Sequence, residues 1–128
     1  MKILKNIALS FCLAASLGAV STSVMAEGDA GRITYAPADA IDMVAAKVGL
    51  AIDAITKGED QEKVSDLIKD VLSASKEINA SDKVFAARDK IHNKLKSARK
   101  HLKEGATQEA EQELRDAQKG FLALKSIL

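Results

Sequence analysis

The clearest pattern of apolar and polar positions lies between residues 110 and 128. Apolar side chains recur there at alternating intervals of four and three residues, at Ala110, Leu114, Ala117, Phe121, Leu124 and Leu128. This spacing places all six on one narrow stripe of an α-helix, with charged residues on the other faces. A helix of this length is marginally stable alone in water, so its stripe must be buried against other helices. The pattern therefore predicts one helix of a bundle.

Three earlier segments have an apolar face of the same kind. We expect helices over about residues 37–57, from residue 60 to about residue 78, and over about residues 83–104. The residues expected to be buried are, in chain order, Ile41, Val44, Val48, Ala51, Ile52, Ile55, Val64, Leu67, Ile68, Val71, Leu72, Ile78, Val84, Ala87, Ile91, Leu95, Ala98 and Leu102. No segment has the alternating pattern of a strand. The sequence therefore predicts an all-α fold.

Local signals mark the ends of these helices. Pro37 suits a first helical turn, where its missing N–H is not needed. Gly58 and Gly105 can supply the left-handed residue that ends a helix. Side chains able to cap the following helices stand at Asp60, at Ser81 or Asp82, and at Thr107.

The two halves of this pattern are related by an internal repeat. A shift of 47 residues maps Val44, Val48, Ala51, Ile55, Gly58 and Leu67 onto Ile91, Leu95, Ala98, Leu102, Gly105 and Leu114. Each half is then a helical hairpin with one uncovered apolar face. Two such hairpins with short loops predict an antiparallel up-down-up-down four-helix bundle over residues 37–128.

The first residues have the features of a secretory signal peptide. Lys2 and Lys5 precede an apolar run over residues 7–20, and small or modest side chains lead to Ala26. We expect cleavage after Ala26, which removes residues 1–26 and delivers the protein to a bacterial periplasm. Residues 27–36 contain Gly28 and Gly31 and show no period, so they are expected to be a flexible leader.

The composition after cleavage excludes several classes of function. The single cysteine, Cys12, lies in the signal segment, so neither disulfides nor a thiolate are available. Two of the 19 basic residues and none of the 18 acidic residues leave with that segment, so the net charge becomes −1. With this balance and few aromatic side chains, nucleic-acid binding is not expected. No nucleophile has a base near it and no glycine-rich phosphate loop is present, so we do not expect an enzyme.

Three residues are candidates for holding a metal ion or haem: Met43, His92 and His101. The two histidines lie nine residues apart, about half a turn from each other around one helix, so they cannot share a site within it. Each flanks a buried position, and a partly exposed helix residue is the simplest interpretation. Met43 sits beside an apolar stripe, where a core or boundary residue is the usual role.

The helix over residues 83–104 has an uneven charge. Between residues 82 and 104, eight basic residues stand against three acidic ones, a local charge of +5. Lys90, Lys94, Arg99 and Lys100 are therefore candidates for docking an anionic partner. In the alternative interpretation, this helix pairs with acidic neighbours, such as Glu111 and Asp116 on the last helix.

The turn before the last helix, residues 104–110, has the sequence EGATQEA, and Val64 with Asp66 falls in a matching frame. In these features the chain resembles the periplasmic cytochrome b562 family. The resemblance implies a four-helix bundle that holds haem b through a methionine near the start of the first helix and a histidine near the end of the fourth. The corresponding positions here are Ala45 and Lys125, so both ligands are missing.

The sequence thus predicts a secreted four-helix bundle without cofactor that acts by binding through its basic third helix. The partner is an unknown protein or anionic surface in the periplasm, and the protein itself is a monomer or a weak dimer. One alternative is a cytochrome b562-like electron carrier that binds haem through Met43 and a histidine outside the family position. Another is a protein that binds metal ions weakly through His92, His101 and surface carboxylates.

Overall fold

The computed structural model describes residues 34–128, and this part of the chain is all-helical with no strand. It contains the helices α2 (Pro37–Thr56), α3 (Gln61–Ser75), α4 (Asp82–Lys103) and α5 (Thr107–Ala123), followed by the short 3-10 helix η1 (Leu124–Ile127). The predicted all-α class is therefore confirmed. The expected signal peptide, residues 1–26, and the leader up to residue 33 lie outside the described residues. The remaining leader residues, 34–36, are exposed and not helical.

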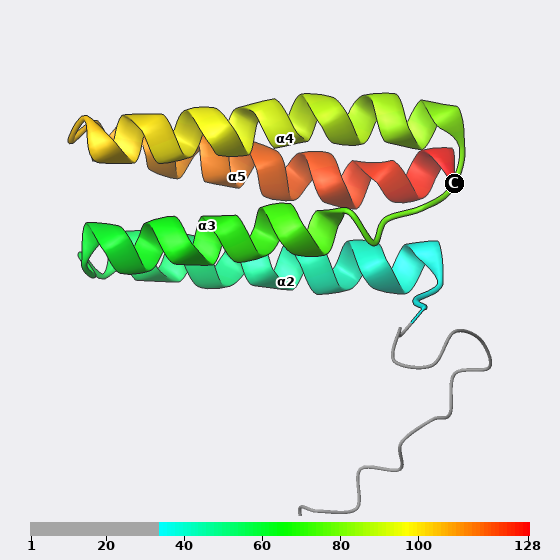
Figure 1. Cartoon of the computed structure of the whole chain (residues 1–128), viewed down its shortest axis with the longest axis horizontal. Coiled ribbons are helices and arrows are strands. Elements are labelled where there is room, and N and C mark those ends of the chain that lie inside the picture. The colour runs from blue at the N-terminus through cyan, green and yellow to red at the C-terminus, as the bar shows by residue number, and fades with distance from the viewer. Residues whose placement is uncertain (1–33) are drawn as a thin grey trace, which may run out of the picture. The chain divides into compact units, whose positions relative to one another are not determined.

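Each of the four helices packs against two others. Helix α2 contacts α3 and α5, and helix α4 contacts the same two, while the pairs α2–α4 and α3–α5 do not meet within residues 34–128. Figure 1 shows the four helices lying lengthwise alongside one another. The turns after α2 and α4 lie at one end, whereas the α3–α4 connection and the C-terminus lie at the other.

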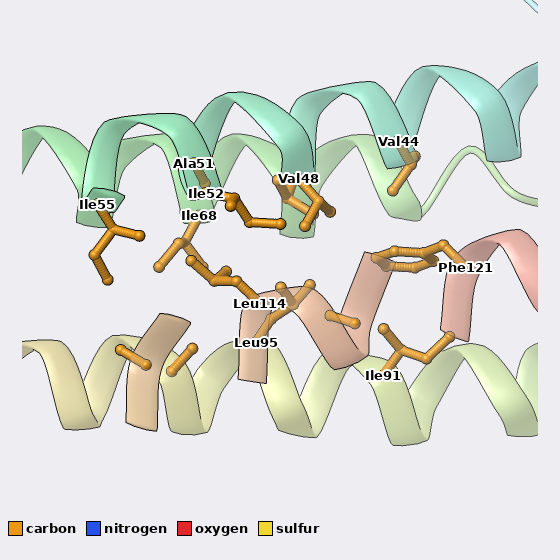
Figure 2. Packing of buried hydrophobic residues seen from close by; sticks show 14 of the residues in the cluster. Val44, Val48, Ala51, Ile52, Ile55, Ile68, Ile91, Leu95, Leu114 and Phe121 are labelled. Carbon is orange, nitrogen blue, oxygen red and sulfur yellow. The ribbon is translucent and has the colours of Figure 1, made fainter. Parts of the chain in front are cut away.

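The predicted apolar stripes form a single core. The largest side chains with no exposed surface include Phe121, Ile41, Ile68, Leu95 and Leu114. Figure 2 shows several of these side chains pointing between the helices toward one another. Complete burial of each such side chain stabilises the fold by about 1.5–3 kcal/mol. The core is therefore the main source of stability.

Two parts of the predicted core pattern differ from the structure. Leu128 is 52% exposed, because α5 ends at Ala123 and the chain continues as η1, which takes Leu128 off the helical stripe. Leu67, Leu72 and Ala87 are only partly buried, at the edge of the core. The prediction of full burial at these four positions was wrong.

Both predicted glycine stops are confirmed. Gly58 and Gly105 have φ of 70° and 79°, in the left-handed region. After α2, the Glu59 amide donates to the Ala54 carbonyl at 3.0 Å, and after α4 the Ala106 amide donates to the His101 carbonyl at 2.8 Å. These bonds close a Schellman motif at the end of each hairpin's first helix.

The predicted N-caps were wrong in their chemistry. Asp60 and Ser81 do stand at the N-cap positions of α3 and α4, but their side chains make no capping hydrogen bond. Thr107 is already inside α5, whose N-cap is Ala106. The first turns instead begin with backbone bonds, such as that from the Val64 amide to the Asp60 carbonyl.

Across residues 34–128, none of the helices combines the length and the apolar character needed to cross a membrane.

Candidate functional site

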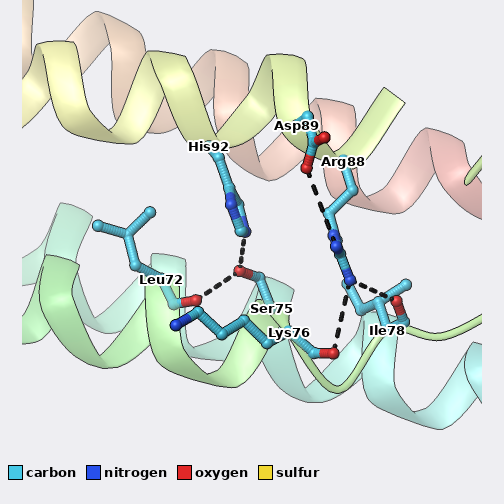
Figure 3. Close-up of polar contacts among 7 residues, drawn as sticks. All are labelled: Leu72, Ser75, Lys76, Ile78, Arg88, Asp89 and His92. Atoms are coloured by element: carbon cyan, nitrogen blue, oxygen red, sulfur yellow. Dashed lines mark hydrogen bonds and ion pairs between the residues drawn. The ribbon is translucent and has the colours of Figure 1, made fainter. Parts of the chain in front are cut away.

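The interface between α3 and α4 is bridged by polar side chains. Ser75 of α3 has no exposed surface, and its hydroxyl donates to the Leu72 carbonyl at 2.8 Å. The same oxygen is hydrogen-bonded to Nε2 of His92 on α4 (Figure 3). Since the one hydroxyl proton is used toward Leu72, Nε2 of His92 is the donor in the second bond. This arrangement places an imidazole N–H against a buried serine oxygen.

The environment of His92 favours its neutral form. Burial lowers its pKa below the ordinary value of 6.5, and the nearby positive charge of Arg88 lowers it further. The carboxylate of Asp89 acts in the opposite direction but does not outweigh them. At neutral pH, His92 is therefore an uncharged hydrogen-bond donor.

Arg88, one turn before His92, holds the end of α3. Its Nη1 donates to the Ile78 carbonyl at 3.0 Å and to the Lys76 carbonyl at 3.5 Å (Figure 3). Its guanidinium carbon also lies 4.8 Å from the centre of the Phe85 ring. A cation on the last carbonyls of a helix is favoured by the helix dipole. Hydrogen bonds from Arg88 and His92 therefore connect α4 to α3 and to the residues that follow it.

A polar groove lies farther along the same interface, with a volume of about 280 Å³. Nε of Arg99 lies 3.3 Å from the Ser65 hydroxyl oxygen, to which it donates. The amide of Gln61 donates to the Leu102 carbonyl. Cationic Lys69 and Lys103 line the groove, and so do acidic residues of α3. Arg99 and Lys103 form the α4 side of this groove.

The four basic residues predicted to bind a partner do not share one face. Lys94 is paired with Asp116 of α5 at 3.6 Å, whereas Arg99 contacts Ser65 on α3. Lys90 and Lys100 are exposed. The expected pairing of α4 with Asp116 is therefore present, while Glu111 is paired within α5, with Arg115 at 2.8 Å.

A different set of basic residues does share a face. Lys96, Arg99, Lys100 and Lys103 occupy positions i, i+3, i+4 and i+7 of α4, which are neighbours on a helix surface. We call these four residues the basic stripe. Its three lysines are exposed, and none of the four is in an ion pair with any residue between 34 and 128. This spacing is present in the sequence. The predicted set, however, combined Arg99 and Lys100 with Lys90 and Lys94, which lie on another side of α4.

The candidate metal ligands lie apart from one another. His101 points to α5, where its Nδ1 lies 2.9 Å from Oε2 of Glu113, and the other oxygen of Glu113 accepts a bond from Ser97 at 2.7 Å. His92 points to α3 instead. No group of three histidine, cysteine or acidic residues that could hold a metal ion is found in the described part of the chain. The two histidines thus face different neighbouring helices.

The positions that the cytochrome b562 resemblance assigns to haem ligands do not fit an iron atom. Ala45 is buried and has no ligating side chain, and its carbonyl accepts a bond from the Gln118 amide at 3.1 Å. Lys125 is paired with Asp42. Met43 is half-buried on α2, which does not contact the helix that carries both histidines.

No protein-family model, no curated protein and no solved structure matches this chain. Within residues 34–128, two features carry polar chemistry: the basic stripe, whose three lysines are exposed, and the Ser75–His92 pair, in which Ser75 is buried and His92 is partly buried.

Proposed function

We propose that the protein is an antiparallel up-down-up-down four-helix bundle, secreted to the periplasm, that docks an acidic protein partner through the basic stripe. The alternating positions of the turns support the antiparallel arrangement (Figure 1). The N-terminal lysines and the apolar run after them support secretion. The charge and exposure of the basic stripe support docking.

The observation that carries this proposal is that the three lysines of the stripe have no ion-pair partner among residues 34–128. Lys63, Lys69, Lys94 and Lys125 each have a carboxylate within the bundle. Lys96, Lys100 and Lys103 have none among the described residues, although they lie on a protein close to neutrality. Clustered like charges repel one another, so an opposing acidic surface lowers their energy. The stripe consists of basic side chains alone. This composition favours a polar contact with another protein over insertion into a bilayer, because insertion needs exposed apolar side chains.

A binding role is proposed in preference to a catalytic one. The serine–histidine pair that the structure contains, Ser75 with His92, has its hydroxyl in the core, where Ser75 has no exposed surface. A substrate carbonyl has no path to that oxygen. The pair is therefore interpreted as a structural contact.

Affinity for a model polyanion tests the docking proposal. The protein is passed over immobilised poly-L-glutamate with the double variant Lys96→Glu/Lys100→Glu and the control Lys47→Glu/Lys57→Glu. The control places the same charge change on α2 and on the residue that follows it. We expect wild-type and control proteins to be retained and eluted by salt, because screening weakens contacts between exposed charges. The stripe variant should flow through. Equal loss of retention in both variants would show that net charge, and not the stripe, determines binding.

The haem and metal alternatives stay as predictions with direct tests. A haem titration that gives a Soret shift would support the first, and calorimetry with Cu²⁺ or Zn²⁺ that gives saturable heat would support the second. In this structure Nε2 of His92 is hydrogen-bonded to Ser75 and Nδ1 of His101 to Glu113, so a metal ion or haem iron would bind the other ring nitrogen of either histidine.

A further inference from the structure

A second groove lies between α4 and the C-terminal end of the chain, away from the basic stripe. It has a volume of about 640 Å³. Its floor is formed by small and apolar residues, with Ala87 and Ile91 from α4 and Gly120 and Leu124 from the other side. Ile127 of η1, which is 39% exposed, forms part of its edge. The groove is therefore an apolar surface that remains open to solvent.

The small residues explain why the groove exists. A Cβ atom at Gly120 would lie 3.0 Å from Cγ1 of Ile91, so the two helices approach closely at this point. Ala86, Ala87 and Ala123 extend only a methyl group into the space beside this contact. Larger side chains at these positions would fill the hollow.

The charged side chains that line the groove are both basic. Lys83 and Lys90 both line it, and they lie seven residues apart on α4, about 10 Å along the helix axis. Both lysines are exposed and neither is in an ion pair with another residue of the 34–128 segment. None of the ten residues that line the groove is acidic. An occupant must therefore combine an apolar body with a negative group.

We propose that this groove binds a single-chain anionic amphiphile, namely a free long-chain carboxylate. The alkyl chain lies along the floor between Ile91, Leu124 and Ile127, and the carboxylate pairs with Lys83 or Lys90. The volume falls in the range of known small-molecule sites. A single carboxylate can pair with either lysine, which matches the positive charge of the groove. This site is independent of the docking face, because it shares no residue with the basic stripe.

Titration of the purified protein with octanoate, decanoate and dodecanoate, each below its micelle concentration, tests the proposal. Amide shifts in ¹H–¹⁵N spectra should saturate and concentrate at Ala87, Gly120 and Ile127. Affinity should rise with chain length, by up to about fourfold for each added methylene. Decyltrimethylammonium, which has the same chain and the opposite charge, should bind at least fivefold more weakly than decanoate.

Variants separate the groove from other surfaces. Lys83→Gln/Lys90→Gln should weaken decanoate binding at least fivefold, whereas Lys47→Gln/Lys57→Gln and the stripe variant Lys96→Glu/Lys100→Glu should leave it unchanged. Both lysines of the groove are exposed, so circular dichroism should show the fold intact. The proposal is overturned by shifts spread over the whole surface or by equal binding of the cationic amphiphile. Shifts that follow protein concentration without ligand would assign the groove to self-association and overturn it as well.

Discussion

Ser75 and His92 are hydrogen-bonded to each other inside the bundle although they lie 17 residues apart in the sequence and on different helices. Ser75 stands at a position that has no exposed surface. A buried hydroxyl and a partly buried imidazole both need partners, and here each supplies one for the other. The pair therefore fixes the register of α3 against α4.

Removal of one member of the pair should destabilise the protein more than removal of both. Ser75→Ala leaves the His92 N–H without its acceptor and should lower the free energy of unfolding by about 1–2 kcal/mol. In a double-mutant cycle with His92→Leu, chemical denaturation should show a coupling of at least about 0.5 kcal/mol. Strictly additive effects would mean that the two side chains do not depend on each other.

Stability should fall as the pH drops below about 6.5. The lowered pKa of His92 means that the unfolded chain binds a proton more readily than the folded one, so folding is weakened once the pH falls through 6.5 toward the folded-state value. Above pH 6.5 this contribution is fully present. His92→Gln keeps an N–H donor but cannot titrate, so its melting temperature should vary less between pH 7.5 and 5. Asn93→Gln, at an exposed position of α4 that does not titrate, serves as the control and should retain the wild-type dependence.

Arg88 should be the strongest single contact at the α3–α4 connection. Arg88→Ala removes the charged donor from the carbonyls of Lys76 and Ile78, and a loss of about 1.5–3 kcal/mol is expected. Hydrogen exchange should then accelerate in residues 76–81 more than in α2. If exchange rises equally throughout the bundle, Arg88 supports global stability and not this connection.

The left-handed glycines should be sensitive to a single methyl group. Gly105→Ala forces an L-residue to φ near 79° and should cost about 1 kcal/mol of unfolding free energy. No atom lies within 4 Å of the added Cβ, so the effect would come from the backbone alone. Thermal denaturation beside the exposed-site control Lys103→Ala would measure it. A stabilised Gly105→Ala variant would contradict the strain argument.

The helices could be predicted because their signals are local and repeated. Val44 and Ile91, which the 47-residue shift relates, are both buried, and Gly58 and Gly105 both end a helix in the left-handed region. Side-chain capping could not be predicted reliably, because Asp60 and Ser81 stand at the expected positions without making the bond. Leu128 was placed in the stripe because periodicity does not show where a helix changes to a 3-10 turn.

The site residues were harder to predict because they depend on contacts between helices. The charge of α4 was visible in the sequence, but the division between Lys94 toward α5 and Arg99 toward α3 required the packing. Ser75 could have been noticed, since it follows Ile68 and Val71 on the same stripe and is polar. The sequence could not show that His92 is the partner of Ser75, because the register of α3 against α4 depends on tertiary packing.

Photo-crosslinking in living cells tests the proposed docking face most directly. p-Benzoylphenylalanine is placed at Lys100, in the basic stripe, or at Lys57, at the end of α2, and adducts are identified by mass spectrometry. If the basic stripe docks an acidic protein, position 100 should give one dominant adduct with such a protein. This adduct should be absent from position 57 and lost when Lys96→Glu and Lys103→Glu are added. Equal adducts from both positions, or an adduct that survives the charge reversal, would contradict the docking proposal.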